Sequence, residues 1–317
     1  MTPAATQAAE TPLDSALLDR ALLDRALRPA ADGTALELPP LPAIAVEVAR
    51  LAAPEEPAAQ GGADGHTRGI AAGALANPAV ALAQLIRRDV ALASQVMRVA
   101  NSALHARRSP IVSLQQAITW LGADEIRRIA YSFAVQAELF SAREFEAQMK
   151  ALWRESIAAA CLAQELARLK RRNVESAYLC GLLHRVGYAV ILWRLARTAQ
   201  RDALTPDPTE AIARLVSGFE NTVGAQLARE WQLPAPVAAC IAAWRAPDAA
   251  PQAHRIDVLE LTVARALAAE LLVTGELSCD AVRVEPAWLE TLNLYPADIE
   301  TLVARSKAIG QTIASYS

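Results

Sequence analysis

Prolines divide the second half of this chain into long segments of residues that favour helices. They stand at positions 206, 208, 234, 236, 247, 251, 286 and 296. Because proline fits the first turn of an α-helix but not its interior, each of these sites marks a junction between helices. Hydrophobic residues make up 53% of the chain and aromatic residues only 5%, so alanine, leucine, valine and isoleucine must fill the core. Since β-branched residues rarely alternate here, the sequence predicts an all-α fold.

Local signals place the individual helices. Asn77 and Pro78 suit the N-cap and the first helical position, and Ser113-Leu-Gln-Gln116 has the form of a capping box that opens a helix ending at Gly122. We expect helices over residues 77–88, 91–102, 113–122, 124–140, 144–169, 174–183, 186–199, 209–217, 220–231, 235–244, 253–273, 286–292 and 297–313.

The chain is expected to have three parts. Residues 1–37 form an N-terminal extension, in which the repeat Ala-Leu-Leu-Asp-Arg at 16–25 predicts a helix with leucines around its circumference. Such a helix needs apolar partners on more than one side, either its own domain or a second copy of the chain. Residues 38–245 form the main helical domain, and their segment 54–73, rich in Pro, Gly and Ala, is predicted to be a mobile loop. Residues 246–317 form a C-terminal helical segment without a recognisable motif.

Charge and cysteine usage favour a cytoplasmic protein. The formal net charge of −3 provides no general attraction to nucleic acid or to an anionic membrane. The four cysteines are far apart and form no Cys-x-x-Cys pair, so we expect reduced, buried thiols and neither a zinc knuckle nor a disulfide framework. The N-terminus lacks the basic and apolar regions of a signal peptide, and no apolar run is long enough to predict a membrane helix.

Several short motifs occur in a fixed order along the chain. They are Leu38-Pro-Pro-Leu-Pro42, the segment from Leu85 to Ser102 that ends in Asn-Ser, Ala117-Ile-Thr-Trp-Leu-Gly122, Gly181-Leu-Leu-His-Arg-Val-Gly187 and Trp231-Gln-Leu-Pro234. Together they resemble the HDOD family, an offshoot of the HD-domain phosphohydrolases that looks non-catalytic. The resemblance covers residues 38–245 and implies an HD-domain-like array of helices.

The resemblance also indicates where a catalytic metal would lie. In an HD phosphohydrolase, His and Asp side chains from several helices hold one or two divalent metals. The adjacent His-Asp pair of that shell reads His184-Arg185 in this chain, and a guanidinium has no lone pair for a metal. The alignment further places Glu155 and Glu220 at positions of histidine in relatives, and Trp244-Arg245 where the family often has His-His. These degenerate positions predict no metal, no cofactor and no catalysis.

Two interpretations of Arg185 remain open at this point. Its guanidinium either fills the vacated metal position and pairs with Glu155, Glu220 or both, with bidentate geometry, or it points to solvent while both glutamates lie on the surface. For His184, a hydrogen bond to the backbone at the edge of the core is favoured over a relic metal ligand. Three arginine pairs are candidates for a partner or anion patch. They are Arg87, Arg88, Arg107, Arg108, Arg127 and Arg128.

The resemblance implies a non-catalytic regulatory protein of bacterial signalling that binds a protein or a small ligand. A protein partner from a signalling pathway is expected, and a second copy of the chain is a further candidate. The alternative is a metal-dependent HD-type phosphohydrolase with an unusual ligand shell of Glu155, His184 and Glu220. Binding of nucleic acid through the arginines of 87–128 is a third hypothesis, opposed by the acidic net charge and by the lack of an aromatic stacking platform.

Overall fold

The regular structure of this chain is helical, as the sequence predicts. The computed structural model describes residues 38–39, 86, 90–102, 111–201, 210–278 and 285–316, and these contain no strand. The α-helices are α5 (Val90–Ala100), α6 (Leu114–Leu139), α7 (Glu146–Leu169), α8 (Val174–Leu183), α9 (Val186–Arg201), α10 (Glu210–Glu230), α11 (Ala235–Ala243), α12 (Arg255–Thr274), α13 (Pro286–Leu292) and α14 (Pro296–Ser315). Short 3-10 helices lie at Arg143–Phe145, Pro247–Ala249 and Gln252–His254.

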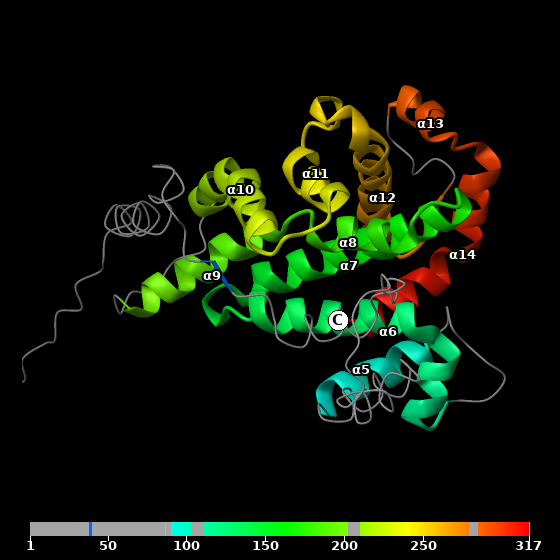
Figure 1. Cartoon of the computed structure of the whole chain (residues 1–317), viewed down its shortest axis with the longest axis horizontal. Helices are drawn as coiled ribbons and strands as arrows, with labels where there is room; N and C mark the ends of the chain where they lie inside the picture. The colour runs from blue at the N-terminus through cyan, green and yellow to red at the C-terminus, as the bar shows by residue number, and fades with distance from the viewer. Residues whose placement is uncertain are drawn as a thin grey trace, which may run out of the picture.

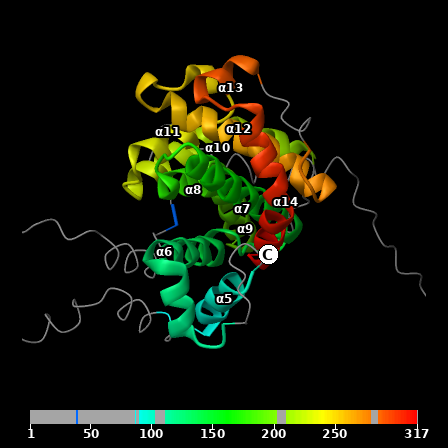
Figure 2. The same cartoon turned by 90° about the vertical axis from the view of Figure 1, so that its right-hand side faces the viewer.

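Helix α7 is the central element of the fold. Helices α8, α12 and α14 all pack against it, while α9 pairs with α10 and α11 contacts both α10 and α8. In Figures 1 and 2, α5 and α6 lie on one side of α7, and α10, α11 and α12 lie on the other. Every residue of α7 from Ser156 to Ala167 is buried, which is expected for a helix surrounded by others on all sides.

Most helix boundaries agree with those predicted from sequence. Helix α8 matches its predicted range, and Asn173 caps it by accepting a hydrogen bond from the Ser176 amide at 2.9 Å. The predicted end of a helix at Gly122 is present as a break inside α6, where this glycine has φ 81°. The predicted separation of 209–217 from 220–231 is wrong, because α10 runs without interruption through Gly218. A glycine inside a helix costs only about 1 kcal/mol relative to alanine, which packing readily offsets.

The C-terminal helices share the core of the main domain. Helices α12 and α14 pack on α7, and the indole Nε1 of Trp153 donates to the backbone oxygen of Tyr316 at 3.0 Å. Near the other end of the domain, Trp231 Nε1 donates to the backbone oxygen of Pro39 at 3.0 Å. The described residues of the segment 246–317 therefore share the core of the main helical domain. The leucine repeat at 16–25 and the segment 54–73 lie outside the described residues.

By length and composition alone, one stretch of the described residues could span a membrane as a helix. This stretch is Val174–Gln200. Of its most apolar window, 72% is buried inside the protein. The backbone also turns between α8 and α9 within this stretch. Its apolar character is therefore explained by its place in the core.

Candidate functional site

Arg185 lies in the turn between α8 and α9 and joins two other helices. Its Nη1 donates to Glu155 Oε2 on α7 at 2.6 Å, and its Nε donates to Glu220 Oε1 on α10 at 3.1 Å. The Arg185 side chain is only 18% exposed. The interpretation in which Arg185 pairs with both glutamates is therefore confirmed, and the one in which it points to solvent is wrong.

The geometry of these ion pairs differs from the bidentate pair that was expected. Glu220 is 1% exposed, and its second oxygen, Oε2, accepts from Arg245 Nη2 at 2.6 Å. Arg185 thus bridges two carboxylates, and Glu220 bridges two guanidinium groups. Because Glu220 is buried, both of its oxygens need charged donors to replace water.

Trp244, which follows the last residue of α11, contacts three arginines of this group through its ring. The guanidinium carbons lie 4.1 Å (Arg265), 4.2 Å (Arg245) and 5.5 Å (Arg185) from the ring centroid of Trp244. These distances are those of cation–π contacts. The ring is buried, so it has no remaining face for a stacked base or sugar.

His184 is fully engaged in hydrogen bonds. Its Nδ1 lies 2.7 Å from the backbone oxygen of Gly181, and its Nε2 accepts from Arg265 Nε at 3.1 Å. Burial, and then the charge of Arg265, hold the pKa of His184 well below its usual 6.5. The ring is therefore neutral, with its proton on Nδ1. The predicted backbone hydrogen bond of His184 is confirmed.

We call this group the arginine cluster. It consists of Glu155, His184, Arg185, Glu220, Trp244, Arg245 and Arg265.

Glycines of the sequence motif bring the helices of the cluster together. A Cβ atom at Gly187 would lie 1.9 Å from the backbone oxygen of Glu220 and 2.8 Å from the amide nitrogen of Gly224. At Gly181, a Cβ would lie 2.4 Å from the Cα of Ala160 on α7. Only glycine permits these backbone contacts, and they bring α10 against α9 and α8 against α7.

The residues present do not fit a metal. Among the described residues, no three His, Cys, Asp or Glu side chains are grouped so that they could hold a metal ion. Each side chain of the alternative ligand shell, Glu155, His184 and Glu220, already accepts a hydrogen bond from an arginine. A divalent cation would have to displace those bonds and enter next to three guanidinium groups.

The two described residues of the predicted arginine patch lie on α6 and are engaged in ion pairs with residues of α6 and α8. Arg127 contacts Glu175 at 2.6 Å and Asp124 at 2.9 Å. Arg128 is buried and pairs with Glu125, so its inclusion in a surface patch is wrong. The other four members, Arg87, Arg88, Arg107 and Arg108, lie outside the described residues, and their patch stays a prediction.

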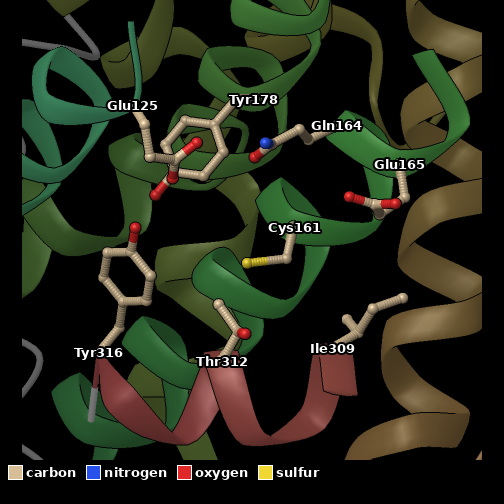
Figure 3. A pocket seen from close by; sticks show the side chains of 8 residues that line it. All are labelled: Glu125, Cys161, Gln164, Glu165, Tyr178, Ile309, Thr312 and Tyr316. Atoms are coloured by element: carbon tan, nitrogen blue, oxygen red, sulfur yellow. The ribbon is translucent and has the colours of Figure 1, made fainter. Parts of the chain in front are cut away.

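A second polar group lies between α7 and α14, but it is structural (Figure 3). It surrounds a cavity about the size of one water molecule. Its buried carboxylates, Glu125 and Glu165, already pair with arginines of α6, α7 and α14, and burial raises the pKa of the Cys161 thiol. Its lining residues are Glu125, Cys161, Gln164, Glu165, Tyr178, Ile309, Thr312 and Tyr316.

Sequence reasoning missed Arg265, because α12 carries no family motif. A signal was nevertheless present: Arg265 interrupts the apolar run Leu261-Thr-Val-Ala-Arg-Ala-Leu267 on a helix that is buried along most of its length. A single cation in such a position needs a specific partner. Here that partner is His184 Nε2.

Comparisons with known proteins agree with the fold. The model of the HDOD domain matches residues 75–247, more than half of the chain. An uncharacterized protein of Treponema pallidum (strain Nichols) is 28% identical over 176 residues, which are 52% of this chain and 33% of that protein. The chain therefore spans about a third of the length of this relative.

Two solved structures share the architecture over nearly their whole length. One is a protein of Shewanella amazonensis SB2B, provisionally assigned as a metal-dependent phosphohydrolase (TM-score 0.64, 21% identity, 94% of this chain and 99% of that one). The other is an HDOD domain protein of unknown function from Geobacter sulfurreducens (TM-score 0.63, 20% identity, 95% and 99%). At this level of identity the likeness concerns the fold alone.

Proposed function

Since this chain belongs to the HDOD domain family, we propose that it is a non-catalytic regulatory protein of bacterial signalling that binds a protein or a small ligand. One observation carries the proposal: a guanidinium, that of Arg185, lies between Glu155 and Glu220. An HD-type phosphohydrolase would need an acidic metal ligand at this position. The proposal includes a cytoplasmic location and no resident cofactor.

Electrostatics argues against metal-dependent hydrolysis. A catalytic metal polarises a phosphoryl group and lowers the pKa of its bound water, and both effects require an open coordination position. The carboxylates that could hold such a metal already pair with Arg185 and Arg245. Arg265 adds a third positive charge within cation–π distance of the same indole. The cluster thus stabilises the helices by ion pairs instead of by a metal.

The same ion pairs suit a binding module. Together with the hydrogen bond from Arg265 to His184, they connect α7, the turn between α8 and α9, α10, the end of α11 and α12, which come from distant parts of the sequence. A ligand or partner that shifts one of these helices would therefore also shift the others, because the cluster connects them. Regulation further requires that the ligand bind two conformations with different affinity.

The metal-dependent phosphohydrolase is the competing candidate, and one experiment separates the two. The protein is purified without chelator, its Mn, Fe, Mg and Zn content is measured by elemental analysis, and hydrolysis of nucleotides and of bis(p-nitrophenyl) phosphate is assayed with each metal. We expect metal well below one equivalent and no turnover above that of the Glu220→Gln variant. Stoichiometric metal with turnover that Glu220→Gln abolishes would establish the phosphohydrolase instead.

A further inference from the structure

The arginine cluster carries an uncompensated positive charge. Three guanidinium groups, those of Arg185, Arg245 and Arg265, face the two carboxylates of Glu155 and Glu220. The other titratable side chains that face these charges, His184 and Tyr188, are neutral, because burial holds the pKa of His184 well below its usual value and raises the pKa of Tyr188. Three positive and two negative charges leave one positive charge in a half-buried site.

Arg265 is the source of this excess. Among the described residues it forms no ion pair, and its one hydrogen bond uses Nε, which donates to His184. Within the part of the chain that the structure describes, its Nη donors bond to no acceptor. Burial, and then the nearby charge of Arg185, lower the pKa of Arg265 to about 10. A guanidinium held in this way is stabilised by any anion that reaches it.

Trp244 adds a second, independent sign of a missing acceptor. Its side chain is 7% exposed, and its Nε1–H finds no acceptor among the described residues. A buried indole N–H usually has one, because a donor that loses water on burial and gains no acceptor destabilises the folded state. This donor belongs to the same ring that contacts all three guanidinium groups.

The cluster is reachable from solvent at one edge. The side chain of Arg245 is 39% exposed and that of Glu155 is 50% exposed, while Glu220 lies beneath them at 1%. Arg245 uses Nη2 for Glu220, and its other donors bond to none of the residues that the structure describes. Arg245 and Arg265 both contact the ring of Trp244, with guanidinium carbons 4.2 and 4.1 Å from its centroid, so they belong to one site.

We propose that Arg245 and Arg265 bind a phosphate group, and that the small ligand of this regulatory protein is a phosphorylated one. The inference rests on the proposed function and gives its ligand a chemical class. Planar guanidinium groups match the oxygens of phosphate with paired hydrogen bonds, and a phosphate dianion offers enough acceptors for both arginines. The enclosed faces of Trp244 exclude base stacking, so recognition is confined to the phosphate.

Calorimetric titration at low ionic strength tests the proposal, with inorganic phosphate and adenosine 5′-monophosphate as probes. Low salt is needed because screening weakens such contacts. Arg265→Gln should weaken binding of at least one probe about tenfold or more, as expected for the loss of charge-assisted hydrogen bonds. Arg265→Lys keeps the positive charge but lacks the paired N–H donors of a guanidinium, so it should weaken binding less than Arg265→Gln does. The matched control is Arg255→Gln on the same helix, whose guanidinium pairs with the exposed Asp248 and not with a member of the cluster, and it should bind like the parent.

Each outcome is decisive for the inference. Binding of the monophosphate at least as tight as that of phosphate supports a phosphate ester as ligand, and weaker binding identifies free phosphate. Absence of binding to the parent protein, or binding that Arg265→Gln leaves unchanged while circular dichroism shows a folded variant, overturns the phosphate site. Neither of these results affects the regulatory proposal, which fails only if the protein holds a metal and hydrolyses its substrate.

Discussion

Replacing Glu220 by glutamine removes the charge at the centre of the arginine cluster while keeping the shape of the side chain. Glu220 is 1% exposed, and each of its oxygens accepts from a different arginine, Arg185 Nε at 3.1 Å and Arg245 Nη2 at 2.6 Å. An amide has a single oxygen, so one guanidinium would face an NH2 group that cannot accept. The lost charge-assisted hydrogen bond is worth about 1.5–3 kcal/mol, and the excess positive charge left behind adds to this. We expect Glu220→Gln to lower the free energy of unfolding by about 3 kcal/mol.

The matched control is Glu155→Gln, the same substitution at the other carboxylate that Arg185 contacts. Glu155 is 50% exposed, so water screens its ion pair and the cost should stay below about 1 kcal/mol. Both variants are unfolded in urea and followed by far-UV circular dichroism, with the slope of the transition checked for equality. Equal destabilisation of the two variants, or none in Glu220→Gln, would refute the view that a buried carboxylate organises this cluster.

Three further predictions concern the surroundings of the cluster. Folding lowers the pKa of His184, so below about pH 6.5 the unfolded chain takes up a proton that the folded protein does not. The free energy of unfolding therefore decreases as the pH is lowered, by up to about 1.4 kcal/mol per pH unit. Urea unfolding between pH 7 and 5.5 should show a shallower loss in His184→Gln, and identical pH slopes would contradict the assignment. Gly187→Ala places a Cβ against the backbone of α10 and should lower the free energy of unfolding by about 3 kcal/mol or more. Gly218→Ala, which has open space around it, should raise the free energy of unfolding by up to about 1 kcal/mol. Thermal melts in which Gly187→Ala is as stable as Gly218→Ala would contradict the close contact at Gly187. Deleting residues 296–317 should abolish the cooperative melt, because α14 packs on α7 and supplies the acceptor for Trp153, and a sharp melt would show instead that these residues are dispensable.

The helices could be predicted closely because local chemistry decides where they end. Asn173 is the N-cap of α8, and this helix begins at the next residue. Pro286 and Pro296 lie in the first turns of α13 and α14. Gly122 breaks α6 through a positive φ, as predicted. The predicted boundary between 209–217 and 220–231 is wrong, because the backbone at Gly218 is helical and α10 continues through it. Such a glycine is distinguished only by tertiary packing, which a single sequence does not show.

The site was predicted in part, for a physical reason. The motif Gly181–Gly187 located His184 and Arg185, and the alignment located both glutamates, so the ion pairs could be proposed before their geometry was known. The sharing of Glu220 between two arginines depends on how α11 packs against α10. The local sequence pattern does not predict this packing. Arg265 lay beyond the motifs altogether, on α12.

The account depends on the guanidinium of Arg185 occupying the place of a divalent metal. Crystals soaked in Mn²⁺ and measured for anomalous scattering test this most directly. We predict no anomalous peak among Glu155, His184 and Glu220, with Arg185 in hydrogen-bond contact with both glutamates. A Mn²⁺ peak coordinated by His184 and either carboxylate, with Arg185 swung away, would contradict the account and favour the hydrolase.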